Sequence, residues 1–119
     1  MIKELRISSI FSEDVEKLLP FYRDTVGLAV GQGGDGFYVM GDVNGPVLGL
    51  GTHSEVRGNA TDQARHIVGF DSDDIEGDYK RLKAAGVEFI EEPNRQGGDG
   101  PQIATFKDPE GNLIQLLQF

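Results

Sequence analysis

The sequence predicts an α+β fold in which two βαβββ modules follow each other along one chain. Two kinds of observation indicate this fold. First, a strand pattern, a helix pattern and three further strand patterns occur twice, in the same order, within 119 residues. Second, the segment 12–16 is similar to 72–76, and the loop QGGDG occurs at both 32–36 and 96–100. The spacing between paired segments grows slowly along the chain, as expected for a duplicated unit with small insertions.

The first module should begin with a strand over 2–11. Alternation predicts that its buried face carries Leu5, Ile7 and Phe11. Ser12 is expected to cap a helix that runs to about Thr25 and ends before Gly27. Pro20 lies inside this span and should kink the helix or divide it into shorter pieces, because proline lacks a backbone N–H. The predicted buried side of the helix consists of Val15, Leu18, Leu19 and Tyr22.

The remaining elements repeat this order. Three strand patterns complete the first module, at 28–30, 37–40 and 46–52. The second module has a strand at 65–70, a helix from about Ser72 to Gly86, and strands at 87–90, 102–106 and 113–117. We therefore predict a single domain over 1–119, with module 1 at about 1–52, a polar linker at 53–64 and module 2 at about 65–119.

The charge balance and the missing residue types exclude several classes of partner. A chain with 20 acidic and 11 basic residues has a net charge of −9, which repels nucleic acid and anionic membrane surfaces. The absence of cysteine excludes disulfides, thiolate metal ligands and a cysteine nucleophile, and it fits a reducing compartment. The first residues contain no long apolar run. We expect a cytoplasmic protein that binds neither nucleic acid nor membrane.

Two local features could carry chemistry by themselves. The QGGDG loops are rich in glycine, as phosphate-binding loops are, but both lie between predicted strands, which favours a hairpin connection. The chain has two histidines, His53 after the fourth strand and His66 at the start of the second module. A single histidine is more often structural than a metal ligand, so neither defines a site alone. The carboxylates fall mostly at helix starts and exposed ends, where capping and solvation explain them.

The last fourteen residues, 106–119, have the pattern of a β-hairpin, with two apolar runs around the turn Asp-Pro-Glu-Gly at 108–111. This hairpin, the segment 20–28 (PFYRDTVGL) and the doubled βαβββ order resemble the vicinal oxygen chelate superfamily. That superfamily contains glyoxalase I, bleomycin-resistance proteins and extradiol dioxygenases, and the resemblance covers nearly the whole chain. It implies curved mixed sheets that form a cleft, which family members often build across a homodimer.

In metal-dependent members of that superfamily, four side chains from the first and fourth strands of the two modules bind a divalent ion. They are usually His, Glu or Gln. The resemblance places these positions, with two alternatives in each first strand, at Arg6 or Ile7, Gly49, His66 or Ile67, and Gln115. Only His66 and Gln115 are candidate metal ligands, whereas a divalent ion normally needs three or more protein ligands.

We therefore expect a metal-independent protein of this type, without a cofactor, that binds a small organic ligand in its cleft. In this hypothesis Gly49 leaves room for the ligand. His66 and Gln115 exchange hydrogen bonds with it, while Phe37 and Tyr38 form an apolar wall. The net charge of −9 favours a cationic ligand, and the sequence identifies no catalytic residue. The alternative is a metal-dependent lyase, isomerase or dioxygenase that binds a divalent ion through unusual ligands or through ligands from a partner subunit.

Overall fold

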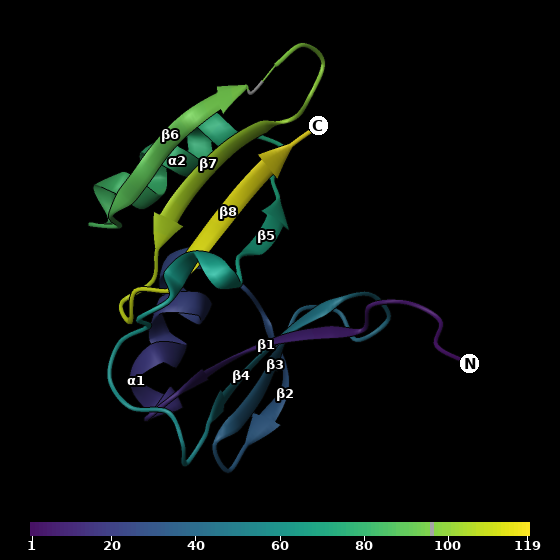
Figure 1. The fold of residues 1–119 in the computed structure, drawn as a ribbon, viewed down its shortest axis with the longest axis vertical. Helices are drawn as coiled ribbons and strands as arrows, with labels where there is room; N and C mark the ends of the chain where they lie inside the picture. The colour runs from purple at the N-terminus through teal and green to yellow at the C-terminus, as the bar shows by residue number, and fades with distance from the viewer. Residues whose placement is uncertain (96) are drawn as a thin grey trace. The chain divides into compact units, whose positions relative to one another are not determined.

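The computed structural model describes residues 1–95 and 97–119, so Gln96 of the second QGGDG loop lies outside the described residues. The chain divides into two compact units, Met1–Gly58 and Asn59–Phe119. The boundary falls within the segment predicted as a linker. Each unit has the order βαβββ and one four-stranded mixed sheet, which confirms the predicted fold class (Figure 1).

Unit 1 is built from one mixed sheet and one helical span. Its elements are β1 (Ile7–Ser12), α1 (Val15–Pro20), the π-helical segment η1 (Phe21–Val26), β2 (Val30–Gly34), β3 (Phe37–Met40) and β4 (Val47–Thr52). The strand order is β1-β4-β3-β2, with β1 parallel to β4 and the other pairs antiparallel. The helix α1 lies against β1 and β4. Its core consists of Ile10, Val15, Leu18, Leu19, Tyr22, Met40, Leu48 and Leu50.

Unit 2 repeats this architecture. Its elements are the 3-10 turn η2 (Gln63–Arg65), β5 (Val68–Asp71), α2 (Ile75–Ala84), β6 (Phe89–Arg95), β7 (Gln102–Lys107) and β8 (Leu113–Gln118). The strand order is β5-β8-β7-β6, and β5 is parallel to β8. Its core consists of Ile75, Leu82, Val87, Ala104, Phe106, Leu113, Ile114 and Leu116. Across residues 1–95 and 97–119, no helix has the length and apolar content needed to span a membrane.

Both helices are capped by aspartates, whereas Ser12 was the predicted cap of the first helix. Asp14 caps α1 and Asp74 caps α2, and each carboxylate accepts a hydrogen bond from a backbone N–H of the first turn. Ser12 and Ser72 lie two residues earlier, and their hydroxyls accept hydrogen bonds from the N–H groups of the capping aspartates, at 3.0 and 3.1 Å. The prediction that Ser12 caps the first helix is therefore wrong by two residues. Ser12 instead accepts a hydrogen bond from the N–H of the capping residue, Asp14.

Pro20 divides the first helical span, as predicted. The α-helix α1 ends at Pro20, and the chain continues as the π-helical segment η1 to Val26. Gly27 then adopts φ +95°, and its N–H donates to the carbonyl of Tyr22. A left-handed residue in this position ends a helix, and glycine adopts that conformation without a steric cost.

The first QGGDG loop is a tight hairpin. β2 extends to Gly34, beyond the predicted strand at 28–30, and Gly34 pairs with Phe37 of β3. Only Asp35 and Gly36 connect the two strands, with φ +54° and +86°. Positive φ at both linking residues is the geometry of a type I′ turn, which matches the twist of the flanking strands. The hairpin interpretation is therefore confirmed for this loop.

The predicted buried face of the first strand is wrong. Leu5 precedes β1 and is exposed, while Ile7 and Phe11 are 40% and 41% exposed. The buried residues are instead Ile10 and Ser12. A polar Ser12 at 0% exposure is possible because its hydroxyl accepts from the Asp14 N–H and its carbonyl accepts from the His53 N–H. The face with Ile7 and Phe11 is the one that α1 does not cover.

Candidate functional site

The sheet of unit 1 has an aromatic cluster on the face opposite its helix, which we call the helix-free face. Phe11 of β1 and Phe37 of β3 have ring centroids 6.3 Å apart, and the His53 ring lies 5.5 Å from Phe11 in an edge-on arrangement. Phe37 is 36% exposed. Ser9 of β1 lies on the same face. These side chains give unit 1 an apolar surface that solvent reaches.

Two glycines of β4 form the floor of this cluster. A Cβ atom at Gly49 would lie 2.6 Å from Ser9 Oγ, 2.8 Å from Phe37 Cζ and 3.0 Å from Ile7 Cδ1. A Cβ at Gly51 would lie 2.7 Å from the Phe37 ring. Both glycines are buried. The space above Gly49 is therefore not empty: it holds the tip of the Phe37 ring, which needs a glycine beneath it in order to lie on the sheet.

Tyr38 lies on the other face of β3 from Phe37. Its hydroxyl donates to Glu16 Oε1 of α1 at 2.7 Å, so its ring is directed toward the helix. This hydrogen bond to a carboxylate raises the pKa of Tyr38 above its ordinary value, with a smaller contribution from partial desolvation. The structure therefore separates two residues that the sequence analysis placed in one wall, because adjacent strand residues point to opposite faces.

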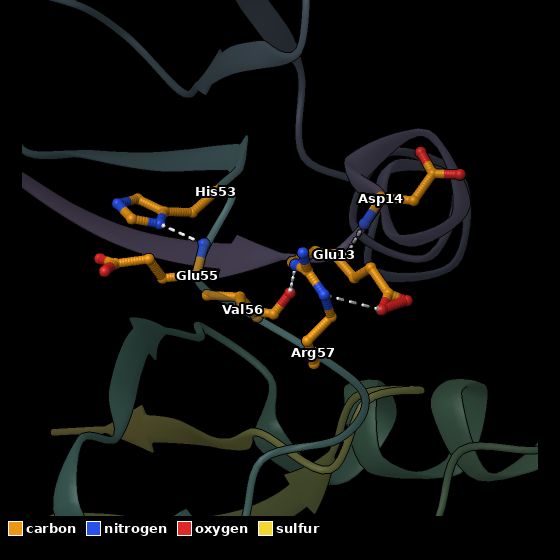
Figure 2. A network of polar contacts seen from close by, with 7 residues as sticks. Glu13, Asp14, His53, Glu55, Val56 and Arg57 are labelled. Carbon is orange, nitrogen blue, oxygen red and sulfur yellow. Dashed lines mark hydrogen bonds and ion pairs between the residues drawn. The ribbon is translucent and has the colours of Figure 1, made fainter.

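His53 has a local structural partner. Figure 2 shows its ring beside the turn that follows β4, where Nδ1 accepts a hydrogen bond from the Glu55 N–H at 3.1 Å. The next turn residues are held by Arg57, which donates to the Val56 carbonyl at 2.7 Å and lies 4.0 Å from the Glu13 carboxylate. Since Nδ1 accepts a hydrogen bond here, a neutral His53 carries its proton on Nε2.

A row of polar side chains crosses the helix-free face of unit 2 at one register level. Gln115 of β8 is paired with Thr105 of β7, and Thr105 is paired with Glu91 of β6. Gln115 Nε2 lies 3.4 Å from Thr105 Oγ1, which lies 3.1 Å from Glu91 Oε1. Thr105 is 4% exposed, while Glu91 and Gln115 are half-buried. We call Glu91, Thr105 and Gln115 the polar row.

The chemistry of these groups fixes the direction of the hydrogen bonds. An ionised Glu91 carboxylate can only accept, so the single hydroxyl proton of Thr105 is donated to it. Gln115 must then donate its amide N–H to Thr105 Oγ1, and its amide oxygen is turned to a different side. The polar row therefore has an acceptor at each end, a carboxylate at Glu91 and an amide oxygen at Gln115.

A β-bulge brings Glu91 to this face. The register between β6 and β7 shifts between Phe89 and Glu91, so that these two residues, which regular alternation would place together, lie on opposite faces. Phe89 packs on the helix side, with its ring centroid 4.7 Å from that of Tyr79. The next acidic residue, Glu92, is also on the helix side, with its carboxylate 3.4 Å from the Tyr79 hydroxyl. Two adjacent carboxylates thus face opposite sides of β6.

Strand pairing bears on the two first-strand alternatives. In unit 1 the pairing of Ser9 with Gly49 puts Ile7, which lies within β1, on the Gly49 face. In unit 2, Gly69 pairs with Gln115, but His66 and Ile67 both precede β5, which begins at Val68. Alternation continued back from Gly69 would give Ile67 the face of Gln115, whereas the pairing itself includes neither Ile67 nor His66.

The donor set does not fit a divalent metal ion. Of the four positions implied by the resemblance, Ile7 and Ile67 are hydrocarbon side chains, Gly49 has none, and the Gln115 amide is engaged with Thr105. Within the described part of the chain, no three His, Cys, Asp or Glu side chains form a group that could hold a metal ion. A metal site would need at least three oxygen, nitrogen or sulfur ligands.

Unit 2 also has a hollow of about 660 Å³ at the ends of β5 and β8, lined by Asp71, Ser72, Asp73, Asp78, Gln118 and Phe119. Its polar groups already serve the helix start. Ser72 Oγ donates to Asp78 at 2.7 Å, and Gln118 Oε1 accepts from the Ile75 N–H at 2.8 Å. Three of the six residues that line the hollow, Ser72, Asp78 and Gln118, are therefore engaged in hydrogen bonds at the start of α2.

Several residues of these faces were missed by the sequence analysis. Thr105 and Glu91 looked like ordinary strand and surface residues, and the bulge that joins them has no signal in the alternation pattern. Ser9 was not singled out, and Phe11 was assigned to the buried side. The resemblance, which gives Gly49 and Gln115 as the fourth-strand positions of the two modules, was the signal that pointed to this level of the sheets.

Comparisons with known proteins agree with this architecture. The model of the Glyoxalase/Bleomycin resistance protein/Dioxygenase superfamily matches residues 5–116. The uncharacterized protein YetH of Bacillus subtilis (strain 168) is 27% identical over 122 residues, which cover 99% of this chain and 100% of YetH. A superfamily member from Sphaerobacter thermophilus has a TM-score of 0.76 at 24% identity, with coverage of 99% and 98%. A protein of unknown function from Agrobacterium tumefaciens has a TM-score of 0.80 at 19% identity, with coverage of 100% and 96%.

Proposed function

We propose that this chain, which belongs to the Glyoxalase/Bleomycin resistance protein/Dioxygenase superfamily, binds a small organic ligand on the helix-free faces of its sheets without a metal ion. The observation that carries the proposal is the position of Phe37 above Gly49. Gly49 stands at one of the four ligand positions of metal-dependent members and has no side chain to bind a metal. The partly exposed Phe37 ring occupies the space where that side chain would be. An aromatic wall with few polar groups around it is typical of small-molecule sites.

The polar groups near these faces support binding more than catalysis. Ser9 supplies a hydroxyl beside Gly49 in unit 1, and Gln115 supplies an amide in unit 2. Both groups exchange hydrogen bonds, but neither can act as a general base at neutral pH. Metal-assisted proton transfer would need ligands that Ile7, Gly49 and Ile67 cannot supply. The exposed aromatic ring and these two hydrogen-bonding groups therefore support recognition of a ligand by stacking and hydrogen bonding.

The proposal is tested by metal analysis and ligand titration of protein purified without chelator. We expect substoichiometric Ni, Zn, Mn and Fe, together with saturable binding of small aromatic fragments followed by NMR. Phe37→Ala should weaken fragment binding about tenfold, because an aromatic contact and its buried area are lost. Tyr38→Phe is the matched control, since it changes the adjacent residue on the opposite face and should leave fragment affinity unchanged.

Two outcomes would overturn the proposal. Stoichiometric metal that is lost in His66→Ala would favour a metal-dependent lyase, isomerase or dioxygenase instead. Absence of saturable binding by every fragment would remove ligand binding itself. Titration with a cationic glycopeptide drug of the bleomycin type then separates drug sequestration from other ligands. The expected homodimer remains a prediction, which light scattering of the purified protein tests.

A further inference from the structure

We infer that the polar row of unit 2 selects a cationic, hydrogen-bond-donating group, such as an amidinium, guanidinium or ammonium, on the ligand. This inference rests on the proposed function, and it adds the chemical class of the group recognised at Glu91, Thr105 and Gln115. The row offers acceptors at its two ends, the Glu91 carboxylate and the Gln115 amide oxygen. A group that carries several N–H donors and a positive charge complements that arrangement.

Thr105 is the positioning residue of the row. Its side chain is 4% exposed, and its hydroxyl donates to Glu91 while it accepts from Gln115. Because one proton serves this hydroxyl, both neighbours are forced into fixed roles: the glutamate as acceptor, the glutamine as donor through its nitrogen. The glutamine oxygen is therefore oriented by the row before any ligand is present, which lowers the ordering cost of binding.

The β-bulge in β6 holds the Glu91 carboxylate in contact with Thr105, so Glu91 has a defined position on the sheet. Regular alternation would place Glu91 on the side of Phe89, against α2. The register shift turns Glu91 to the helix-free face, into contact with Thr105, while Glu92 remains against Tyr79. Bulges commonly re-aim a side chain next to a functional site.

The charged neighbours leave the face negative. By strand alternation the same face carries Asp71 at the end of β5 and Lys107 at the end of β7. Lys107 Nζ lies 3.4 Å from Glu88, so this cation is already matched by a carboxylate. A cationic ligand group would therefore be attracted by the Glu91 carboxylate, and an anionic one would be repelled.

The test uses the full chain and three flat probes of similar size that differ in charge: 4-aminobenzamidine, 4-aminobenzamide and 4-aminobenzoate. Dissociation constants come from NMR titration, with the backbone amides of Thr105 and Gln115 as reporters. We expect the amidinium to bind about tenfold more tightly than the neutral amide, since hydrogen bonds to a charged partner are about twice as strong as neutral ones. The benzoate should bind most weakly.

The variants use the two adjacent carboxylates as a matched pair. Glu91→Gln should reduce the preference for the amidinium over the amide to about onefold, and Glu92→Gln should leave it unchanged. Thr105→Val, which keeps the shape but removes the hydroxyl, should lower the preference about threefold, and Thr105→Ser should restore it. Spectra of the free variants confirm that each retains the fold.

The outcomes are distinct. Equal affinity for amidinium and amide, or an equal effect of Glu91→Gln and Glu92→Gln, would overturn this inference and leave the proposed function standing. A Thr105→Ser variant that behaves as Thr105→Val would overturn the positioning role. Absence of saturable binding by all three probes would overturn this inference, while the aromatic-fragment titration decides the proposed function separately.

Discussion

Replacing Asp108 by Asn should weaken the turn that sets the register of β7 and β8. Asp108 is 4% exposed and accepts three hydrogen bonds: Oδ1 from the N–H groups of Glu110 and Asn112, both at 2.9 Å, and Oδ2 from Asn112 Nδ2 at 2.8 Å. Thr105 and Gln115 pair across this hairpin. The turn therefore also positions the polar row.

The size of the effect follows from the three contacts. In Asp108→Asn the amide oxygen can still serve the two backbone N–H groups, but the amide nitrogen faces Asn112 Nδ2, formerly 2.8 Å away, as donor against donor. One charge-assisted bond is lost, which costs about 1.5–3 kcal/mol of unfolding free energy. Asp108→Ala removes the carboxylate that accepts these three hydrogen bonds in a buried turn and should cost about 3–5 kcal/mol.

Exchanging the two side chains gives a rescue test. Asn112→Asp alone puts two carboxylates in contact, which should be destabilising. In the double variant D108N/N112D, the amide nitrogen at position 108 can donate to the carboxylate at position 112. We expect the double variant to be more stable than the sum of the single changes by about 2 kcal/mol or more, because neighbouring residues in one network couple.

The assay must report on unit 2, because two compact units can unfold in separate transitions. Urea unfolding followed by far-UV circular dichroism gives the free energies. Amide hydrogen exchange of peptides that cover 102–118 locates the loss. A double variant that is destabilised by the full sum of the two single changes, or protection lost equally in unit 1 peptides, would refute the reasoning.

Two further predictions concern unit 1. Gly49→Ala should lower the free energy of unfolding by about 1–2 kcal/mol, since its Cβ would press on the Phe37 ring and two other side chains. Gly45→Ala is the control: its Cβ meets nothing closer than 4.0 Å, and it should change the free energy of unfolding by no more than about 0.5 kcal/mol. Urea unfolding of the two variants gives both values. The Tyr38 phenol should titrate above its ordinary pKa because of Glu16, and Glu16→Gln should lower that pKa, as read from phenolate absorbance. With a raised folded-state pKa, the Tyr38 contribution to stability is complete below the unfolded pKa and is lost as pH rises through the folded one. A Tyr38 pKa that does not respond to Glu16→Gln would contradict that assignment.

The fold could be predicted because two independent signals agreed, the doubled element order and the helical spacing of the buried side chains. The stripe of Val15, Leu18 and Tyr22 is buried as predicted. What failed was the choice of face in β1, because alternation defines two faces and does not say which one a helix will cover. Ser12 was expected as a helix cap, and the structure buries it with both its hydroxyl and its carbonyl hydrogen-bonded.

Strand boundaries failed where composition argues against a strand. Gly33 and Gly34 have little strand propensity, yet β2 runs through them because β3 pairs alongside. β6 continues to Arg95 although it contains Pro93, which an edge strand tolerates. Pairing with a neighbour therefore decided these residues, and a single sequence carries no direct signal for it.

The candidate site could be predicted at the level of sheet position and not at the level of side-chain direction. Gly49 and Gln115 lie at corresponding levels of the two sheets, as the internal repeat indicated. The position of Phe37 above Gly49 is a packing outcome. The contact between Glu91 and Thr105 depends on a register shift that the residue types in β6 do not predict.

The two parallel strand pairs, β1–β4 and β5–β8, differ in the residues that they place at the level of Gly49 and Gln115. At the level of Gly49 the parallel pair of unit 1 presents Ser9 and a glycine, and in unit 2 it presents Gln115 and a second glycine, Gly69. In each case an apolar side chain occupies the space above the glycine, Phe37 over Gly49 and Leu117 over Gly69, where a Cβ would lie 2.7 Å from Leu117 Cδ1. At this level each parallel strand pair therefore presents one hydroxyl or amide beside a hydrocarbon group. Neither pair offers two metal-binding side chains, and this composition is the reason that we propose hydrogen-bonded recognition and not coordination chemistry.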